Sequence, residues 1–347
     1  MVMSLLSFAG RRRNLLAETP EHVRQLKLSH PILTPEDMLR IRNAAHPDLK
    51  AADIDILFPA DGDGAALGAA LDSVFAQAEQ HIAAGAALLI LTDRHLDAAR
   101  APIPVLLAAA GLHHHLTRKG LRTAAGILVE SGEPREVIHF ALLLAYGANA
   151  VCPTVAFATV RQLCEEGLLE APCSPEEALD HYITAVKKGL LKTFSRMGIS
   201  TIRSFLGSQI FEAVGLADDL VATCFTGTVS RLGGVGLHEL AAEAVARHRR
   251  GFPPTREGEA PAEPPRLLDL GGAYHTRLGG EKHLLSPDAL FTLQHACRTG
   301  SYAAFKHYSR IVDEQASLEV TLRSLLQFKP TTPIPIEEVE PVEAILP

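Results

Sequence analysis

The sequence predicts an α/β fold, a degenerate TIM-like β/α barrel with an N-terminal arm and a helical C-terminal part. Between residues 51 and 152, short apolar runs alternate with longer amphipathic stretches. This spacing is typical of parallel strands joined by right-handed crossover helices. The chain has 347 residues, which suffices for one barrel of about 250 residues. After residue 286 the pattern is helical.

Composition and charge exclude several classes of protein. Apolar residues make up 47% and charged residues 21% of the chain, as in soluble globular proteins. The net charge of −7 provides no basic surface for nucleic acid, and no apolar run approaches the roughly 20 residues that span a bilayer. The five cysteines have no regular spacing, which argues against a disulfide framework, a zinc site or an iron–sulfur cluster. We therefore expect a cytoplasmic protein with reduced thiols and no nucleic-acid or membrane partner.

Residues 1–50 are predicted to form an N-terminal arm that lies across a neighbour. A threonine, a proline and a glutamate at residues 19–21 indicate a helix start, and a short helix is expected over 20–28. Residues 29–33 are expected to be extended, because a residue before proline avoids the helical region. Thr34 then caps a second predicted helix, which continues to about Asn43.

Residues 51–250 are predicted to form the α/β core. The apolar runs predict strands at 53–59, 87–94, 123–130, 150–152 and 222–225. The amphipathic stretches predict helices at 67–85, 104–120, 134–147, 175–188, 210–214 and 238–248. Basic residues near 187–196 suit a helix C-terminus, whose carbonyls carry partial negative charge.

Three segments follow the core. Residues 251–266 are rich in proline and glutamate and are expected to be a solvated insertion. Residues 267–329 are expected to form the helical C-terminal part, with helices at 289–299, 302–311 and 318–328. Residues 330–347 form an exit segment whose prolines exclude a regular helix, and we expect it to be an extended strand with apolar residues left exposed.

One group of polar residues has the character of an active site. Glu130 ends a predicted strand, where barrel enzymes hold their catalytic groups, and Glu133, Glu136 and His139 follow it. A stand-alone barrel enzyme would combine Glu130 and His139 with the glycine-rich loop at 233–236, which precedes a helix and could cradle a phosphate. The alternative is structural, because acids are favoured in a first helical turn and glycines form tight turns.

Two further motifs are predicted not to bind metal. His113, His114 and His115 are consecutive, and consecutive residues on a helix point about 100° apart, so they cannot converge on one ion. Residues 61–64 alternate aspartate and glycine as a calcium loop does, but the other ligands of such a loop are missing. A solvated turn is the expectation there.

The runs KKGLLKTFSRMGIST at 187–201 and SFLGSQIFEAVGL at 204–216 resemble the central region of the large subunit of glutamate synthase. The resemblance extends to shorter runs at 129–133, 139–141, 146–148, 227–231, 270–272 and 279–281. It covers essentially the whole chain, from Met3 to Pro341.

The resemblance implies a place in a larger enzyme. Glutamate synthase releases ammonia from glutamine in an amidotransferase domain, and a tunnel carries the ammonia to a barrel with FMN and an iron–sulfur cluster. There 2-oxoglutarate is converted to glutamate with electrons from ferredoxin or NAD(P)H. The resemblance implies that this chain joins those two domains, the amidotransferase expected before Met1 and the FMN-binding domain after Pro347. It implies no catalytic residue, cofactor or metal in this chain, which alone is expected to be inactive.

The resemblance also implies part of the tunnel wall. The matching positions are Met3, Ser4, Ser29, His30, Pro31, Ile32, Leu33 and Thr34. Small, weakly polar groups suit the passage of neutral ammonia, because an acidic group would trap it as ammonium. Two alternatives stay open, that these are ordinary arm residues, or that the arm and the proline-rich tail dock partner proteins.

Overall fold

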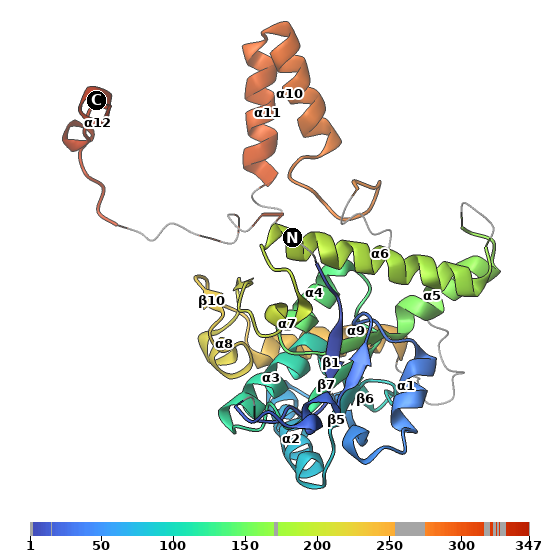
Figure 1. Ribbon diagram of the computed structural model, residues 1–347. Helices are drawn as coiled ribbons and strands as arrows, with labels where there is room; N and C mark the ends of the chain where they lie inside the picture. Colours follow the sequence, from blue (N-terminus) through green and yellow to red (C-terminus); the bar gives the residue numbers. More distant parts are fainter. Residues whose placement is uncertain are drawn as a thin grey trace, which may run out of the picture. The chain divides into compact units, whose positions relative to one another are not determined.

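The computed structural model describes residues 3–14, 16–169, 173–253, 275–315 and 331–346, together with 320, 321, 324 and 326. Contacts within the chain divide it into two compact units, Met1–Pro264 and Pro265–Pro347. Figure 1 shows the helices and strands of both. Among the described residues, no helix is both long and apolar enough to cross a membrane.

A four-stranded parallel sheet forms the centre of the first unit (Figure 1). Its strands, in spatial order, are β3 (Ala51–Asp55), β5 (Leu88–Thr92), β7 (Gly126–Ser131) and β8 (Ala150–Pro153). Every residue of β5, β7 and β8 is buried, which is the pattern of parallel strands covered on both faces. The predicted strands at 87–94, 123–130 and 150–152 are therefore confirmed.

Helices connect the successive strands. They are α2 (Gly64–Ala83), α3 (Val105–Arg118) and α4 (Val137–Ala145). The carboxylate of Asp63 caps α2 by accepting hydrogen bonds from the backbone N–H groups of Ala65 and Ala66, both at 3.0 Å. The turn predicted at 61–64 is thus a helix start. The predicted strand at 53–59 is divided, because β4 (Leu57–Pro59) leaves the parallel sheet and pairs antiparallel with β6 (Arg100–Pro102).

The N-terminal segment packs on the core of its own unit. Its elements are β1 (Ser7–Ala9), a 3-10 helix at Pro20–Val23, β2 (Leu26–Leu28), α1 (Pro35–Arg42) and a 3-10 helix at Pro47–Leu49. Leu5, Ile32 and Met38 are buried in that core. The predicted helix over 20–28 is wrong beyond Val23, because β2 pairs antiparallel with β1. The helix capped by Thr34 is confirmed, with a capping box that includes Asp37.

The chain after β8 is largely helical. Its elements in the first unit are α5 (Thr154–Glu165), α6 (Pro175–Arg196), α7 (Ile202–Phe205), β9 (Glu212–Ala213), α8 (Asp218–Cys224), β10 (Val229–Ser230) and α9 (Leu237–Gly251). The predicted helix at 210–214 is wrong, because β9 pairs with β10 there. The predicted strand at 222–225 is also wrong, because α8 buries Leu220, Val221 and Cys224 at helical spacing. Helix α5 was not predicted.

The α/β class with a parallel sheet is confirmed, whereas a closed barrel is not seen. Within the described ranges, no strand pairing joins β3 to β8. The region after β8 carries apolar residues at helical spacing instead of apolar runs, as in α6, which buries Ile183, Val186 and Leu190. The outer edge of β8 is occupied by residues 31–33, because Val151 exchanges backbone hydrogen bonds with Pro31 and Leu33 at 2.8 and 2.9 Å.

The second unit contains a helical hairpin of α10 (Pro287–Thr299) and α11 (Tyr302–Gln315), which confirms two predicted helices. Most of the third, at 318–328, lies outside the described residues, as does most of the predicted insertion at 251–266. The described exit segment, 331–346, holds a 3-10 turn at Ile336–Glu338 and the single-turn helix α12 (Val342–Ile345), so the expected strand is wrong there. Its apolar side chains are exposed, as expected, with Ile336 at 81%.

The close approach of α4 and α6 gives a stability test. A Cβ atom on Gly189 would fall inside van der Waals contact with both Cγ atoms of Val137. We expect Gly189→Ala to lower the free energy of unfolding by about 1–3 kcal/mol, because overpacking costs that much. Urea unfolding monitored by circular dichroism measures this.

The matched control is Gly251→Ala, since Gly251 has open space around its Cα atom, and it should be neutral or slightly stabilising. In a chain that already carries Val137→Ala, Gly189→Ala should lower the free energy of unfolding by less than it does in the unchanged chain. A loss from Gly189→Ala that Val137→Ala does not reduce would contradict the proposed contact.

Candidate functional site

Polar side chains gather where the parallel strands end, which is the edge that carries the active site in many α/β proteins. Thr92 ends β5 and Asp93 follows it, while Glu130 and Ser131 end β7. Thr92, Asp93, Glu130 and Ser131 are all buried. The hydrogen bonds and ion pairs of these four side chains determine whether they could act on a substrate.

The Glu130 side chain has no exposed surface and is fully paired. Arg42, at the end of α1, donates to its two carboxylate oxygens at 2.5 and 3.3 Å. The Thr92 hydroxyl and the Arg94 guanidinium donate at 3.0 and 3.4 Å. Burial alone would raise the pKa of Glu130, but the hydrogen bonds and positive charge of Arg42, helped by Thr92 and Arg94, lower it. Glu130 is therefore an ionised carboxylate held by three donors.

Arg42 links this carboxylate to a second strand. Its guanidinium also donates to the carboxylate of Asp53 on β3, at 2.8 Å. The hydrogen bonds to Glu130 and Asp53 raise the pKa of Arg42. The end of α1 is thus fastened to both β3 and β7 through one cation.

Two other acids hold the loop that follows β7. Asp93 accepts hydrogen bonds from the Ser131 hydroxyl at 2.5 Å and the Gly132 backbone N–H at 3.0 Å. The Glu133 carboxylate accepts from the backbone N–H of Val105, the first residue of α3, at 2.9 Å. Burial is the main reason that the pKa values of Asp93 and Glu133 are both raised. These carboxylates connect the loop to β5 and to α3.

The structure does not bring Glu130 and His139 together. The Nδ1 atom of His139 accepts hydrogen bonds from the backbone N–H groups of Arg135 and Glu136, at 3.1 and 3.2 Å, and so caps α4. His139 and Glu133 line a pocket of about 160 Å³ between α3, α4 and α9, and Glu130 is not among its lining residues. This arrangement supports the structural alternative for His139.

The glycine-rich loop at 233–236 forms a structural turn. The backbone N–H of Val235 donates to the carbonyl of Gly215 at 2.8 Å, and that of Gly236 donates to the Glu239 carboxylate at 2.8 Å. These two N–H groups are therefore already used. A phosphate cradle would need them to point toward a ligand.

The three consecutive histidines have different neighbours. Nδ1 of His113 accepts from the Arg122 guanidinium at 2.9 Å, and His115 bonds the Glu79 carboxylate at 2.6 Å. The ring of His114 is nearly perpendicular to that of His113, with an interplanar angle of 86°. They do not converge on one point.

The residues predicted for a tunnel wall lie in two places. Ser4 is held beside α7 by backbone hydrogen bonds with Ser200 and Ile202, at 2.9 and 3.2 Å, and Met3 lies partly buried against the core. Residues 31–33 are buried along β8. Ser29 and His30 precede them, and the Thr34 hydroxyl accepts from the Asp37 backbone N–H at 3.1 Å to cap α1. Burial lowers the pKa of His30.

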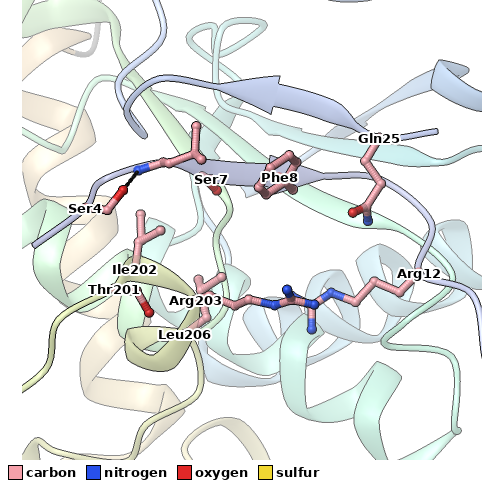
Figure 2. A pocket seen from close by; sticks show the side chains of 10 residues that line it. Ser4, Ser7, Phe8, Arg12, Gln25, Thr201, Ile202, Arg203 and Leu206 are labelled. Carbon is pink, nitrogen blue, oxygen red and sulfur yellow. Dashed lines mark hydrogen bonds between the residues drawn. The ribbon is translucent and has the colours of Figure 1, made fainter. Parts of the chain in front are cut away.

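Ser4 lines a pocket of about 180 Å³. Figure 2 shows this pocket between the N-terminal segment and the chain around α7. Its remaining walls are Leu6, Ser7, Phe8, Arg12, Gln25, Thr201, Ile202, Arg203 and Leu206. The Ser4 hydroxyl accepts a hydrogen bond from the Leu6 backbone N–H at 3.1 Å.

Two residues that hold the N-terminal segment on the sheet were not predicted to do so. Arg42 pairs with a carboxylate 88 positions away, and nothing in the local pattern of α1 indicates that partner. Asn149 is 3% exposed, and its side chain accepts from the Ile127 backbone N–H at 2.9 Å and donates to the Phe8 carbonyl at 3.2 Å. From the sequence, an asparagine that follows a glycine turn is expected to be a turn residue. The function of Asn149 in joining β1 to the sheet is therefore not apparent from the sequence.

Comparison with known proteins identifies related chains. Residues 1–217 match the family described as glutamate synthase central domain. The chain is 42% identical to the large chain of the NADPH glutamate synthase of Bacillus subtilis, over 100% of this chain and 22% of that protein. It is 36% identical to the NADH glutamate synthase of Schizosaccharomyces pombe, over 98% of this chain and 16% of that protein. It is 37% identical to ferredoxin-dependent glutamate synthase 2 of Synechocystis sp., over 100% of this chain and 23% of that protein.

The chain thus spans about a fifth of the length of these relatives. Among solved structures, a mutant flavocytochrome b2 with benzoylformate aligns with 39% of this chain and 31% of its own, at 14% identity and a TM-score of 0.32. A similarity of that size carries no argument about function or fold.

The buried ion pair gives a second stability test. Arg42→Met would leave Glu130 buried without its main partner, so we expect the free energy of unfolding to fall by about 3–5 kcal/mol. Adding Glu130→Gln should restore part of the loss, because it removes the unpaired charge. The control is Arg24→Met, which removes an exposed pair with Asp48 at 3.5 Å and should cost less than about 1 kcal/mol. Equal decreases in unfolding free energy from Arg42→Met and Arg24→Met would show that the Arg42–Glu130 pair contributes no more than an exposed ion pair.

Acid should weaken the contribution of Glu130. Because its pKa is lowered in the folded state, its ionisation stabilises the fold above the ordinary glutamate pKa of about 4.3. That contribution is lost as the pH falls through the folded-state pKa. The difference in unfolding free energy between the unchanged chain and Glu130→Gln should therefore shrink between about pH 7 and about pH 3.

Urea titrations at constant ionic strength measure this difference. The control is Glu212→Gln, which removes a surface partner of Arg231 at 3.2 Å and should have little effect at any pH. A Glu130→Gln difference that stays constant across the pH range would refute the argument.

Proposed function

The chain belongs to the glutamate synthase central-domain family, and from this premise we propose that it joins the amidotransferase and FMN-binding domains of a glutamate synthase. The observation that carries the proposal is the similarity of the whole chain to proteins about five times its length. Those relatives are named for different electron donors, NADPH, NADH or ferredoxin. The shared segment would therefore serve a step that does not depend on the donor.

In the complete enzyme, glutamine, 2-oxoglutarate and reductant would give two molecules of glutamate. The family resemblance assigns release of ammonia from glutamine to the amidotransferase domain, and amination and reduction to the FMN-binding domain. This chain would hold the amidotransferase and FMN-binding domains in a fixed relative position and would form part of the wall of the ammonia path between them. It would be inactive alone.

The strand-end residues support a connecting function more than a catalytic one. Glu130 is neutralised by Arg42 and Arg94, and His139 caps a helix. Asp93 accepts hydrogen bonds from the loop that follows β7. In a catalytic site, such groups would be expected to face one substrate cavity together, whereas the pocket that His139 lines does not include Glu130.

The glycine-rich loop and the two buried cysteines also argue against FMN or an iron–sulfur cluster at these positions. A flavin phosphate needs free backbone N–H groups, and those of Val235 and Gly236 are engaged. Cys152 and Cys224 are buried, and burial raises the pKa of each thiol, to about 12 and about 11, which disfavours the thiolate that binds metal. In the part of the chain that the structure describes, no group of three or more metal-ligating side chains converges. Both cofactors are proposed to belong to the neighbouring FMN-binding domain.

Met3 and Ser4 are proposed to form part of the ammonia path, with the segment 29–34 behind them. Ser4 is small, is fixed by its backbone beside Ser200 and Ile202, and faces a cavity. No acidic residue lines that cavity among the residues described, so none of these side chains would hold ammonia as ammonium. Residues 31–33, buried beside β8, would support the wall from within.

A hybrid enzyme tests the proposal. This chain would replace the matching segment of the Bacillus subtilis large chain, and Ser4→Asp would place an acid on the path. We expect glutamate formation from glutamine to fall at least about tenfold, about 1.4 kcal/mol in activation free energy. Formation from added ammonia, and glutamine hydrolysis, should be retained. Initial rates with each nitrogen source measure the effect.

The control is Ser73→Asp on the exposed surface of α2, which should leave both rates unchanged. Equal loss with both nitrogen sources would mean that Ser4→Asp damages the fold and not the path. A hybrid without any glutamine-dependent activity would contradict the connecting function itself.

A further inference from the structure

The pocket beside Ser4 contains two arginines that point toward one another. Figure 2 shows Arg12, which follows β1, and Arg203, on α7, with their guanidinium groups facing each other along the floor of the pocket. Ser4 lies at the opposite end of the pocket from Arg12 (Figure 2). Two cations from distant parts of the sequence therefore meet in one hollow.

Neither guanidinium has a counter-ion among the described residues. Some other arginines of the first unit do have one. Arg42 pairs with Asp53 and Glu130, and Arg100 pairs with Asp97 at 2.8 Å. No hydrogen bond or ion pair links the Arg12 or Arg203 side chain to another described residue. Arg12 and Arg203 are both exposed residues. Partial burial of the Arg12 guanidinium, and then the charge of Arg203, lower the pKa of Arg12.

A third arginine adds positive charge nearby. The charge of Arg12 acts on Arg122, and the Arg122 guanidinium donates to neutral groups, the carbonyls of Ala125 and Gly147 and the His113 ring. Burial, and then Arg12, lower the pKa of Arg122 to about 10. Within the described part of the pocket wall, every charged residue is an arginine. An anion would relieve the repulsion of this group.

The pocket has the size and chemistry for a small oxyanion. Its volume of about 180 Å³ exceeds the roughly 30 Å³ of one water molecule. Two guanidinium groups can bind carboxylate or phosphate oxygens in a bidentate manner. Phe8, Ile202 and Leu206 supply apolar walls, which would accommodate the short carbon chain of an organic acid.

We propose that Arg12 and Arg203 form a binding site for a small oxyanion with two negative charges, either phosphate or a short dicarboxylate. The two positive charges match a dianion better than a monoanion such as chloride. The inference does not rest on the proposed function of the chain, because both arginines belong to this chain and the site needs no neighbouring domain.

The test is calorimetric titration of the chain with inorganic phosphate and, separately, with malonate, in chloride buffer at constant ionic strength. We expect saturable binding of at least one of the two. Arg203→Ala and Arg12→Ala should each weaken it at least about tenfold, because each removes a charge-assisted contact. Arg161→Ala is the matched control, since Arg161 is an exposed arginine of α5 outside the pocket, and it should leave binding unchanged.

A charge-reversal variant keeps the test informative if an alanine variant folds poorly. Arg203→Glu would pair with Arg12, so it should raise the thermal midpoint in chloride and abolish the response to phosphate and malonate. Binding by phosphate alone would assign the site to inorganic anions, and binding by malonate alone would assign it to organic acids. No saturable binding of either, or binding that survives in Arg203→Glu, would overturn the proposal.

Discussion

A carboxylate with no exposed surface lies at the end of the central strand β7, and the arrangement around it depends on neutralising that charge. An unpaired buried carboxylate is strongly unfavourable. Glu130 is neutralised chiefly by Arg42, which reaches it from α1, 88 residues earlier in the chain. The N-terminal segment must therefore be in place before the sheet edge is complete. Asn149 and the backbone of residues 31–33 fasten the same segment at two other points.

In the part of the chain that the structure describes, the strand ends are thus occupied by side chains that are paired with one another. In catalytic α/β folds, the carboxyl edge of the sheet is left open to a substrate. Here Arg42, Thr92 and Arg94 surround Glu130, and the loop after β7 is held by Asp93. A segment that connected two other domains, as we propose, would need firm attachment of its entry strand to its core, and the same contacts would supply it.

The sequence could predict what depends on local pattern, and not what depends on distant partners. The apolar runs of β5, β7 and β8 predicted the parallel sheet, and Thr34 indicated where α1 begins. The position of Glu130 at a strand end was also predictable, whereas its partner Arg42 was not. Strand pairing overrode helical spacing at Glu212–Ala213, and helical packing in α8 overrode the short apolar run at 222–225. The convergence of Arg12 and Arg203 depends on how α7 docks beside β1, which no local pattern reports.

The central claim is that this chain connects and positions neighbouring domains without a flavin site of its own. The most direct measurement is the visible absorbance spectrum of the purified chain after incubation with excess FMN and gel filtration. The account predicts a colourless protein fraction, with all the flavin eluting as free cofactor. A yellow protein that retains FMN in stoichiometric amount would contradict it, and the strand ends around Glu130 would then have to be re-examined as a reaction centre.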